Sequence, residues 1–170
     1  MQRILVIGSA GSGKSTLSRY LGEKLSIPVV HLDRIYWRPK WVEPGKEEWL
    51  ERVRNVISAQ SWIIDGNYSG SLAVRLEACD TIVFLDLPRL TCLWRVLSRA
   101  LRYHGRSRPD MAAGCAERLD IAFLLWIWHY PYRSRPKVMS LLEASRLTRK
   151  VIHLRTHREV KLFIDGLAAT

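Results

Sequence analysis

The chain has 170 residues, of which 48% are apolar and 25% charged, a composition typical of one globular domain. Its longest wholly apolar run, residues 121–128, is far shorter than the roughly 20 residues that a membrane-spanning helix needs, so we expect no membrane span. The net charge is +11, and almost all of the excess follows residue 88, which indicates a polyanionic partner for the second half of the chain.

The first half of the chain alternates short apolar runs with segments of helical periodicity. In order, we expect a strand at 3–7, a helix through 17–25, a strand at 27–32, a loop at 36–45, a helix through 49–57, a strand at 62–64, a short helix at 71–76 and a strand at 81–85. The loop is rich in Trp, Pro and Gly, which favour turns over regular elements.

The second half is predicted to be mainly helical. In order, we expect a helix at 89–104, a loop at 105–114, a helix at 117–130, a proline break at 131–136, a helix to about 147, a strand at 151–154 and an amphipathic helix at 158–167. The strands are continuously apolar, which is typical of a parallel sheet covered by helices on both faces. We therefore expect one α/β domain over residues 1–170.

A glycine-rich loop lies between the first strand and the first helix and matches G-x-x-x-x-G-K-[ST]. Its residues, which we predict to bind ATP, are Gly8, Ser9, Ala10, Gly11, Ser12, Gly13, Lys14, Ser15 and Thr16. The glycines let backbone N–H groups face phosphates, and the following helix adds its N-terminal dipole. Lys14 is predicted to reach the outer phosphates and the Ser15 hydroxyl to bind Mg²⁺.

Among phosphate-loop proteins, the sequence favours a small kinase. The D-x-x-G and N-K-x-D patterns that GTPases of this type need do not occur in the sequence. The chain is also short for a motor or transport ATPase. A kinase must hold its acceptor opposite the loop with charged groups, and three later segments supply such groups.

Aspartates at predicted strand ends are the first candidates. Asp65 and Asp86 each follow an apolar strand, where Mg²⁺ and its waters are held in this type of fold, although either could instead cap a loop. Asp33 ends another strand at the same edge. It could take the proton of an acceptor hydroxyl as general base, or only position an acceptor that is already a phosphate.

Arg95, Arg99, Arg102 and Arg106 are spaced 4, 3 and 4 and share one face of the predicted helix. The leucines at 90, 93, 97 and 101 are expected on the opposite face, packed on the core. A purely arginine face is suited to phosphate binding, although a solvated surface is the alternative. Arg108 and Arg118 flank the next loop, whose Gly105 and Gly114 could act as hinges of a lid. We expect Arg95, Arg99, Arg106 and Arg108 to be catalytic.

Tryptophans mark two further regions. Trp126, Trp128 and Tyr130 could indicate membrane contact or base stacking, but a helix buried under the lid is the favoured interpretation because the segment is apolar nearly all round. Trp37 and Trp41 are expected to form a wall of the acceptor pocket or to fill the core.

Cys79, Cys92 and Cys115 are odd in number and form no C-x-x-C pair, which argues against a disulfide framework and a zinc site. The N-terminal apolar run is too short for a signal sequence. We therefore expect a cytoplasmic protein.

With these residues in view, the chain resembles the nucleoside-monophosphate kinases, such as adenylate kinase, and most closely the bacterial family of DNA topology modulation proteins or adenylate-kinase-related kinases. The matching segments are G-S-A-G-S-G-K-S-T (8–16), H-L-D-R-I-Y-W (31–37), W-I-I-D-G-N-Y (62–68), A-C-D-T-I-V-F-L-D (78–86) and R-P-D-M-A-A-G-C-A-E-R (108–118). The resemblance implies a three-layer P-loop NTPase fold with a five-stranded parallel sheet in the order 2-3-1-4-5. It also implies a helical lid over about 104–136.

Several site residues follow from this resemblance. Asp65 and Gly66 look like the Asp-Gly of the adenylate kinase acceptor segment, in which Asn67 and Tyr68 replace Phe-Pro and Arg75 is a displaced candidate for its arginine. Arg95 and Arg99 look like the arginines at the foot of the lid. Arg155 is assigned to the ATP side of the site.

The segment around Asp33 looks like the acceptor aspartate region of shikimate- and gluconate-type kinases, but Ile35 stands where those have a second acid. We therefore expect a kinase that uses ATP and Mg²⁺ to phosphorylate a small acceptor, a nucleotide or nucleoside. The alternative is a nucleic-acid-binding regulator whose basic second half contacts phosphates and whose ATP site is a switch.

Overall fold

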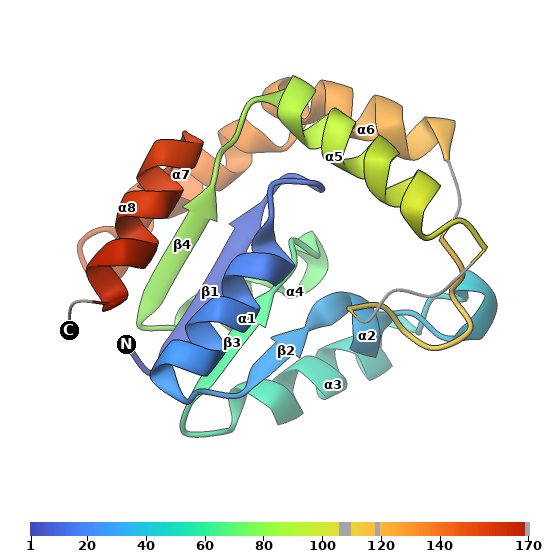
Figure 1. Ribbon diagram of the computed structural model, residues 1–170. Coiled ribbons are helices and arrows are strands. Elements are labelled where there is room, and N and C mark those ends of the chain that lie inside the picture. Colours follow the sequence, from blue (N-terminus) through green and yellow to red (C-terminus); the bar gives the residue numbers. More distant parts are fainter. Residues whose placement is uncertain (106–109, 118–119, 169–170) are drawn as a thin grey trace.

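The computed structural model describes residues 1–105, 110–117 and 120–168. At its centre is a five-stranded parallel sheet in the order β2-β3-β1-β4-β5 (Figure 1). The strands are β1 (Arg3–Gly8), β2 (Val29–His31), β3 (Trp62–Asp65), β4 (Thr81–Leu85) and β5 (Lys150–Leu154). This sheet confirms the α/β fold predicted from the apolar runs and the strand order that the family resemblance implied.

The sheet is covered on both faces, which explains its continuously apolar strands. In β1, Ile4 and Val6 point into one apolar cluster, and Leu5 and Ile7 point into the other. The first cluster is completed by α1 (Lys14–Leu25) and α8 (His157–Ala168), and the second by α3 (Lys46–Ile57), α4 (Ser69–Ala78) and α7 (Arg135–Ser145).

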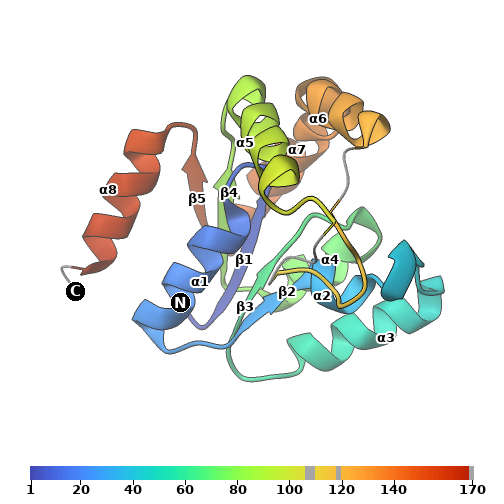
Figure 2. The same cartoon turned by 45° about the vertical axis from the view of Figure 1, so that its right-hand side comes forward.

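Two helices, α5 (Arg89–Arg102) and α6 (Ile121–Arg133), pack against each other beyond the carboxyl ends of the strands (Figures 1 and 2). Between them, residues 110–117 return to the segment that follows α2 (Leu32–Tyr36) and contains the 3₁₀ turn η1 (Pro39–Trp41). There, Met111 and Cys115 pack with Trp37 and Trp41. The pair of helices and this return segment enclose a space above the phosphate loop.

Three element boundaries differ from the prediction. The second strand is shorter than expected, because Leu32 begins the helix α2. The helix expected from residue 117 begins at Ile121, where the side chain of Asp120 caps it by accepting a hydrogen bond from the Phe123 N–H. Pro131 does not end this helix. It removes a single backbone donor, and the chain turns only at Ser134, between α6 and α7.

The faces of α5 are also arranged differently. Its buried side chains are Cys92, Val96 and Ala100, because this strip faces the phosphate loop. A Cβ atom on Gly11 would lie only 2.3 Å from the Cys92 carbonyl oxygen, an approach so close that only glycine fits at this position of the loop. Leu90 and Leu101, predicted to pack on the core, are instead 66% and 82% exposed.

The prediction that the segment around Trp126 is a wholly buried helix is wrong in the same way. Ile127 and Tyr130 of α6 are buried, whereas Trp126 and Trp128 are about 40% exposed. No helix of the described residues is long and apolar enough to cross a membrane. Of the predicted lid at about 104–136, Arg106, Arg108 and Arg118 lie outside the described residues.

Candidate active site

The phosphate loop joins β1 to α1 in the middle of the sheet, as its sequence position predicts. Gly11 and Gly13 have φ angles of 76° and 99°, in the left-handed region that favours glycine. The backbone thereby turns at the N-terminus of α1, where unpaired N–H groups favour an anion.

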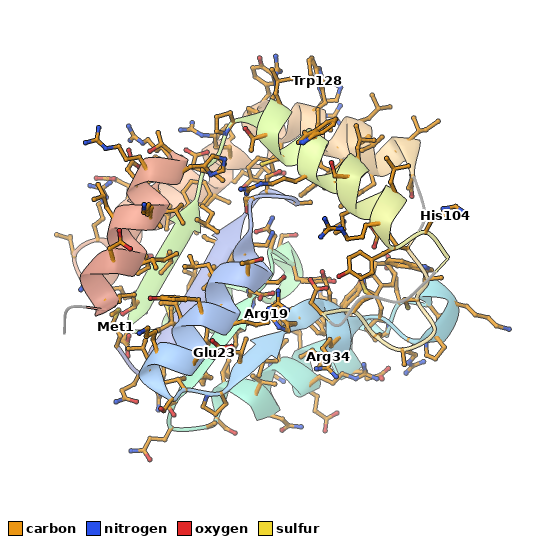
Figure 3. The ribbon with its side chains drawn as sticks, in the orientation of Figure 1. Met1, Arg19, Glu23, Arg34, His104 and Trp128 are labelled. Atoms are coloured by element: carbon orange, nitrogen blue, oxygen red, sulfur yellow. The ribbon has the colours of Figure 1, made fainter. Side chains whose placement is uncertain are left out.

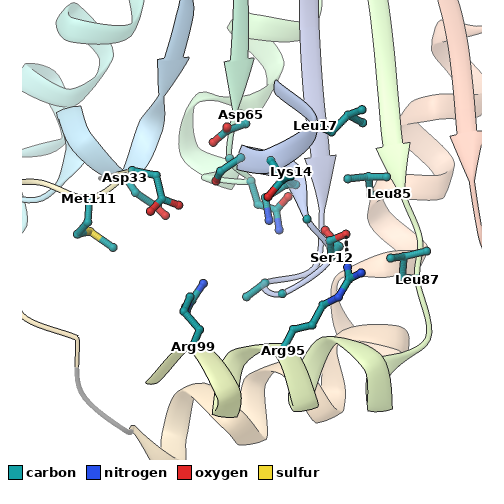
Figure 4. Close-up of a pocket in the computed structure, with 18 of the residues that line it drawn as sticks. Ser12, Lys14, Leu17, Asp33, Asp65, Leu85, Leu87, Arg95, Arg99 and Met111 are labelled. Carbon is teal, nitrogen blue, oxygen red and sulfur yellow. Dashed lines mark hydrogen bonds between the residues drawn. The ribbon is translucent and has the colours of Figure 1, made fainter. Parts of the chain in front are cut away.

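Two cations lie at this loop. The Lys14 ammonium donates to the carbonyl oxygens of Gly8 and Ser9 at 3.0 and 2.9 Å. Burial lowers the pKa of Lys14, and the carboxylates of Asp65 and Asp33 oppose that effect. From α5, Arg95 points toward the loop and donates to the Ser12 carbonyl oxygen at 3.2 Å (Figure 4).

These residues fit a polyphosphate and its magnesium ion. Among the described residues, the buried hydroxyl of Ser12 has no hydrogen-bond partner, so the loop holds an unused polar group beside its free N–H groups. The hydroxyl of Ser15 and the carboxylate of Asp65 line the same cavity and are hard oxygen donors, which Mg²⁺ prefers. No cluster of three or more acidic, His or Cys side chains that could hold a metal by themselves occurs in the described ranges.

Asp65 is held in place by His31, which is not among the predicted site residues. His31 and Asp65 are paired in the register of β2 and β3, and the His31 Nδ1 atom lies 2.6 Å from the Asp65 Oδ2 atom. Burial opposes protonation of His31, but the hydrogen bond and charge of Asp65 raise its pKa overall. The histidine thus fixes one carboxylate oxygen at the edge of the cavity.

The segment after β3 is locked to the phosphate loop. The side-chain amide of Asn67 accepts a hydrogen bond from the Gly8 N–H and donates one to the Gly8 carbonyl, at 3.1 and 2.8 Å. Below it, Arg75 is fully buried and donates to the carbonyl oxygens of Gly66, Asn67 and Tyr68. Arg75, predicted to bind substrate, is therefore occupied in shaping this turn and does not line the cavity.

Asp33 lies at the opposite end of the cavity, in the first turn of α2. The Tyr68 hydroxyl donates to the Asp33 Oδ1 atom at 2.6 Å. Burial, together with the negative charge of Asp33, raises the pKa of Tyr68, which keeps this hydroxyl a donor. Tyr68, Trp37 and Trp41 line the cavity, and the two tryptophans also pack on Met111 and Cys115. Their role as a wall for the acceptor stays a prediction.

Besides Arg75, and Gly8 and Ser9 at the start of the phosphate loop, two predicted site residues in the described part of the chain do not line the cavity. Asp86 accepts hydrogen bonds from Arg135 at 2.9 Å and pairs with His153 at 2.9 Å, and it does not line the cavity. It therefore connects β4 to α7 and β5 instead of facing Ser15. Arg155 is exposed, its backbone N–H donates to Glu159, and it does not line the cavity.

One cavity of about 1200 Å³ brings the remaining parts together. The predicted residues that line it are Ala10, Gly11, Ser12, Gly13, Lys14, Ser15, Thr16, Asp33, Asp65, Gly66, Asn67, Tyr68, Arg95 and Arg99. In Figure 4, Arg95 and Arg99 point from α5 toward Lys14 and the loop, and Asp33 faces the same space from the other side.

The lining also contains residues that sequence reasoning missed. Glu117 lies 3.2 Å from the Arg99 Nε atom and orients that arginine. His157, Val160 and Ile164 of α8 line the cavity, as do Phe123 and Trp126 of α6. Only the apolar periodicity of α6 and α8 could have indicated these residues, and periodicity does not tell a cavity from a core.

No protein-family model and no curated protein matches the chain, so its likeness to the topology modulation family stays a prediction. Among solved structures, it is similar to shikimate kinase from Acinetobacter baumannii in complex with shikimate, at 17% identity and a TM-score of 0.56 over 100% of this chain and 95% of that one. It is also similar to shikimate kinase from Bacteroides thetaiotaomicron, at 17% identity and a TM-score of 0.54 over 99% and 96%.

A third similar structure is a gluconokinase from Sinorhizobium meliloti 1021, at 15% identity and a TM-score of 0.55 over 99% of this chain and 92% of that one. At such low identity these likenesses show the fold alone. The chain shares the three-layer fold of these structures, a five-stranded parallel sheet with helices on both faces.

Proposed function

We propose that the chain is a kinase that transfers the γ-phosphoryl group of Mg²⁺-bound ATP to a small acceptor. The observation that carries this proposal is that the phosphate loop, Lys14 and Asp33 line the same cavity (Figure 4). Solved structures of the same fold are named shikimate kinase and gluconokinase, which supports phosphoryl transfer to a small molecule.

The cations around the loop are suited to stabilising charge on a group in transfer. Arg95 and Arg99 extend from α5 toward Lys14, so three positive charges face the space above the loop (Figure 4). When bound, Mg²⁺-ATP would supply the phosphoryl group and a divalent cation that offsets the charge of its phosphates. Ser15 and Asp65 are the residues that would hold the magnesium ion.

The acceptor is a hydroxyl in this proposal, not a phosphate. Arg75 is the arginine that the resemblance placed in the acceptor segment. It donates hydrogen bonds to backbone carbonyl oxygens instead. Asp33 instead offers a carboxylate, which Tyr68 holds in place through one oxygen. A carboxylate in that position can accept the proton of a hydroxyl as it attacks the phosphorus atom.

The walls of the acceptor end favour a flat substrate. Trp37, Trp41 and Tyr68 line this end, and aromatic rings bind flat rings by stacking. Nucleotides and nucleosides both carry such a ring, so the choice of a nucleoside hydroxyl rests on Arg75, whose donors bind backbone carbonyl oxygens.

The proposal is tested by incubating the protein with Mg²⁺ and ATP against nucleosides, nucleoside monophosphates and small hydroxylated metabolites, with ADP release as the readout. We expect acceptor-dependent ADP release with a nucleoside. Lys14→Ala should lower the turnover at least 100-fold, because it removes a charge that acts on the transferred group. Lys24→Ala is the matched control, since Lys24 is an exposed residue of the same helix outside the cavity.

Unchanged turnover in Lys14→Ala would contradict the proposed site. Turnover with monophosphates only would contradict the hydroxyl acceptor but leave the kinase standing. ATP binding without turnover on any acceptor would favour the alternative, a nucleotide-gated binding protein.

A further inference from the structure

The helices α5 and α6 each carry an apolar stripe that the fold leaves exposed. On α5 the exposed members are Leu90, Trp94 and Leu101, and on α6 they are Ile121, Leu125, Trp128 and Tyr132. Their exposed fractions run from 39% to 82%. The spacing of each set is helical, so each stripe occupies one side of its helix. Large apolar surfaces of this kind on a globular protein mark an interaction site.

The two stripes belong to one outer surface. Arg89, the first residue of α5, has its guanidinium 3.9 Å from the centre of the Trp128 ring and 5.8 Å from that of Tyr132. It thereby joins the outer sides of the two helices. In Figure 3, Trp128 points away from the body of the molecule. We call these seven apolar residues, together with Arg89, the outer face.

The outer face is separate from the candidate active site. The inner sides of the same helices serve the cavity, where Arg95 and Arg99 of α5 and Phe123 and Trp126 of α6 line it. The buried sides pack the helices onto the loop and onto each other through Val96 and Ile127. None of the seven apolar residues of the outer face lines the cavity, so neither the fold nor the proposed kinase activity explains them.

The charge pattern identifies the occupant. Neither α5 nor α6 contains an aspartate or a glutamate. Arg95 and Arg99 face the cavity, which leaves Arg89, Arg102 and Arg133 as the arginines of these helices that do not line it. A second copy of this chain would bring arginines toward arginines, which disfavours a dimer through this surface. An anionic lipid surface offers the complement of both features, acyl chains for the apolar stripes and phosphates for the arginines.

We propose that the outer face of α5 and α6 docks on an anionic lipid surface. Exposed tryptophan and tyrosine rings favour the boundary between headgroups and acyl chains, where one end of the ring is apolar and the other wet. The stacked Arg89 lies beside these rings, at the depth of lipid phosphates. This docking is peripheral and independent of whether the cavity transfers a phosphoryl group.

The test is sedimentation of the full chain with vesicles of phosphatidylcholine alone or with about 30% phosphatidylglycerol. We expect binding to the anionic vesicles that is at least tenfold stronger than to phosphatidylcholine alone and weakens with added salt. The double variant Leu90→Gln/Leu101→Gln should lose at least tenfold in partitioning, and so should Trp94→Gln. These side chains are exposed, so circular dichroism and the melting temperature should stay those of the wild type.

The matched control is Leu147→Gln/Leu162→Gln, which removes two exposed leucines away from the outer face, where they are 95% and 60% exposed. This variant should bind anionic vesicles like the wild type. If the control and the test pair bind equally, the net charge of the whole chain alone explains the attraction and the proposal is wrong. The proposal is also overturned if the wild type does not bind anionic vesicles. A dimer in light scattering that Trp94→Gln dissociates, without any vesicle binding, would overturn it as well.

Discussion

Asp33 is the residue on which the chemistry of the acceptor depends. It stands across the cavity from the phosphate loop, and Tyr68 donates to one of its two carboxylate oxygens. If it accepts the hydroxyl proton, Asp33→Asn should lower kcat by about 10²- to 10⁴-fold, the usual contribution of a general base. The KM for the acceptor should change little, because an asparagine keeps the size of the side chain and one oxygen that can accept from Tyr68. Steady-state kinetics with the acceptor identified by ADP release measures both.

Tyr68→Phe is the companion to this variant, because it keeps the aromatic wall and removes only the hydroxyl that orients Asp33. We expect a loss in kcat of about tenfold or less, since one neutral donor to a carboxylate contributes about 1.5 kcal/mol. A raised KM at constant kcat in Asp33→Asn would instead assign Asp33 to positioning the acceptor, the other role that its sequence position left open.

At the scale of secondary structure, Asp86 connects three elements. It directly follows β4, pairs with His153 of β5 and accepts two hydrogen bonds from Arg135 at the start of α7. We expect Asp86→Asn to lower the free energy of unfolding by about 2–4 kcal/mol, because it breaks a partly buried charge network. In Asp86→Asn the Mg²⁺ dependence of turnover should stay unchanged. Asp65→Asn, in contrast, should weaken that dependence. Urea unfolding and a Mg²⁺ titration of the rate measure these effects.

The same network sets the pH dependence of stability. Burial opposes ionisation of Asp86, but the hydrogen bonds and charges of Arg135 and His153 hold its pKa below the ordinary value of 3.8 overall. Because the folded-state pKa of Asp86 is lowered, its ionised side chain contributes fully to stability above pH 3.8. That contribution is lost as the pH falls through the lowered pKa of the folded state. The stability difference between wild type and Asp86→Asn should therefore be constant at neutral pH and shrink below about pH 4. A constant difference down to pH 2 would contradict this assignment.

The elements themselves follow from local signals, but their side chains depend on partners. Continuous apolar runs and the glycine loop predict the sheet and the phosphate site, because both signals lie within a few residues. Arg75 and Asp86 are different, since an isolated charge in a sequence does not reveal whether carbonyl oxygens or another ion will bind it. Helix α5 has a buried face, a cavity-facing arginine face and an exposed leucine face. Helical spacing groups the residues of each face but does not tell which face is buried, so the exposed leucines were assigned to the core.

For the molecule as a whole, the position of α5 and α6 separates two kinds of positive charge. Arg95 and Arg99 face inward on the cavity, while Arg89 and Arg133 belong to helix sides away from it. The net charge of +11 therefore predicts a weak general attraction to polyanions beside a specific site for a nucleotide. The general attraction and the specific nucleotide site can be separated by experiment, because only the general attraction is spread over the surface and screened by salt.

Thermal unfolding of the full chain makes this separation measurable. Mg²⁺-ATP at about 100 times its Kd should stabilise the fold by about 2.7 kcal/mol, which raises the Tm of a domain of this size by about 5–10 °C. Most of this shift should persist in 0.3 M salt and vanish in Lys14→Ala, because the site is local and half-buried. Lys161→Ala, which removes an exposed positive charge of α8 outside the cavity, should keep the full shift. An equal shift in both variants, lost with salt, would mean that ATP binds as a general polyanion and that the phosphate loop does not select it.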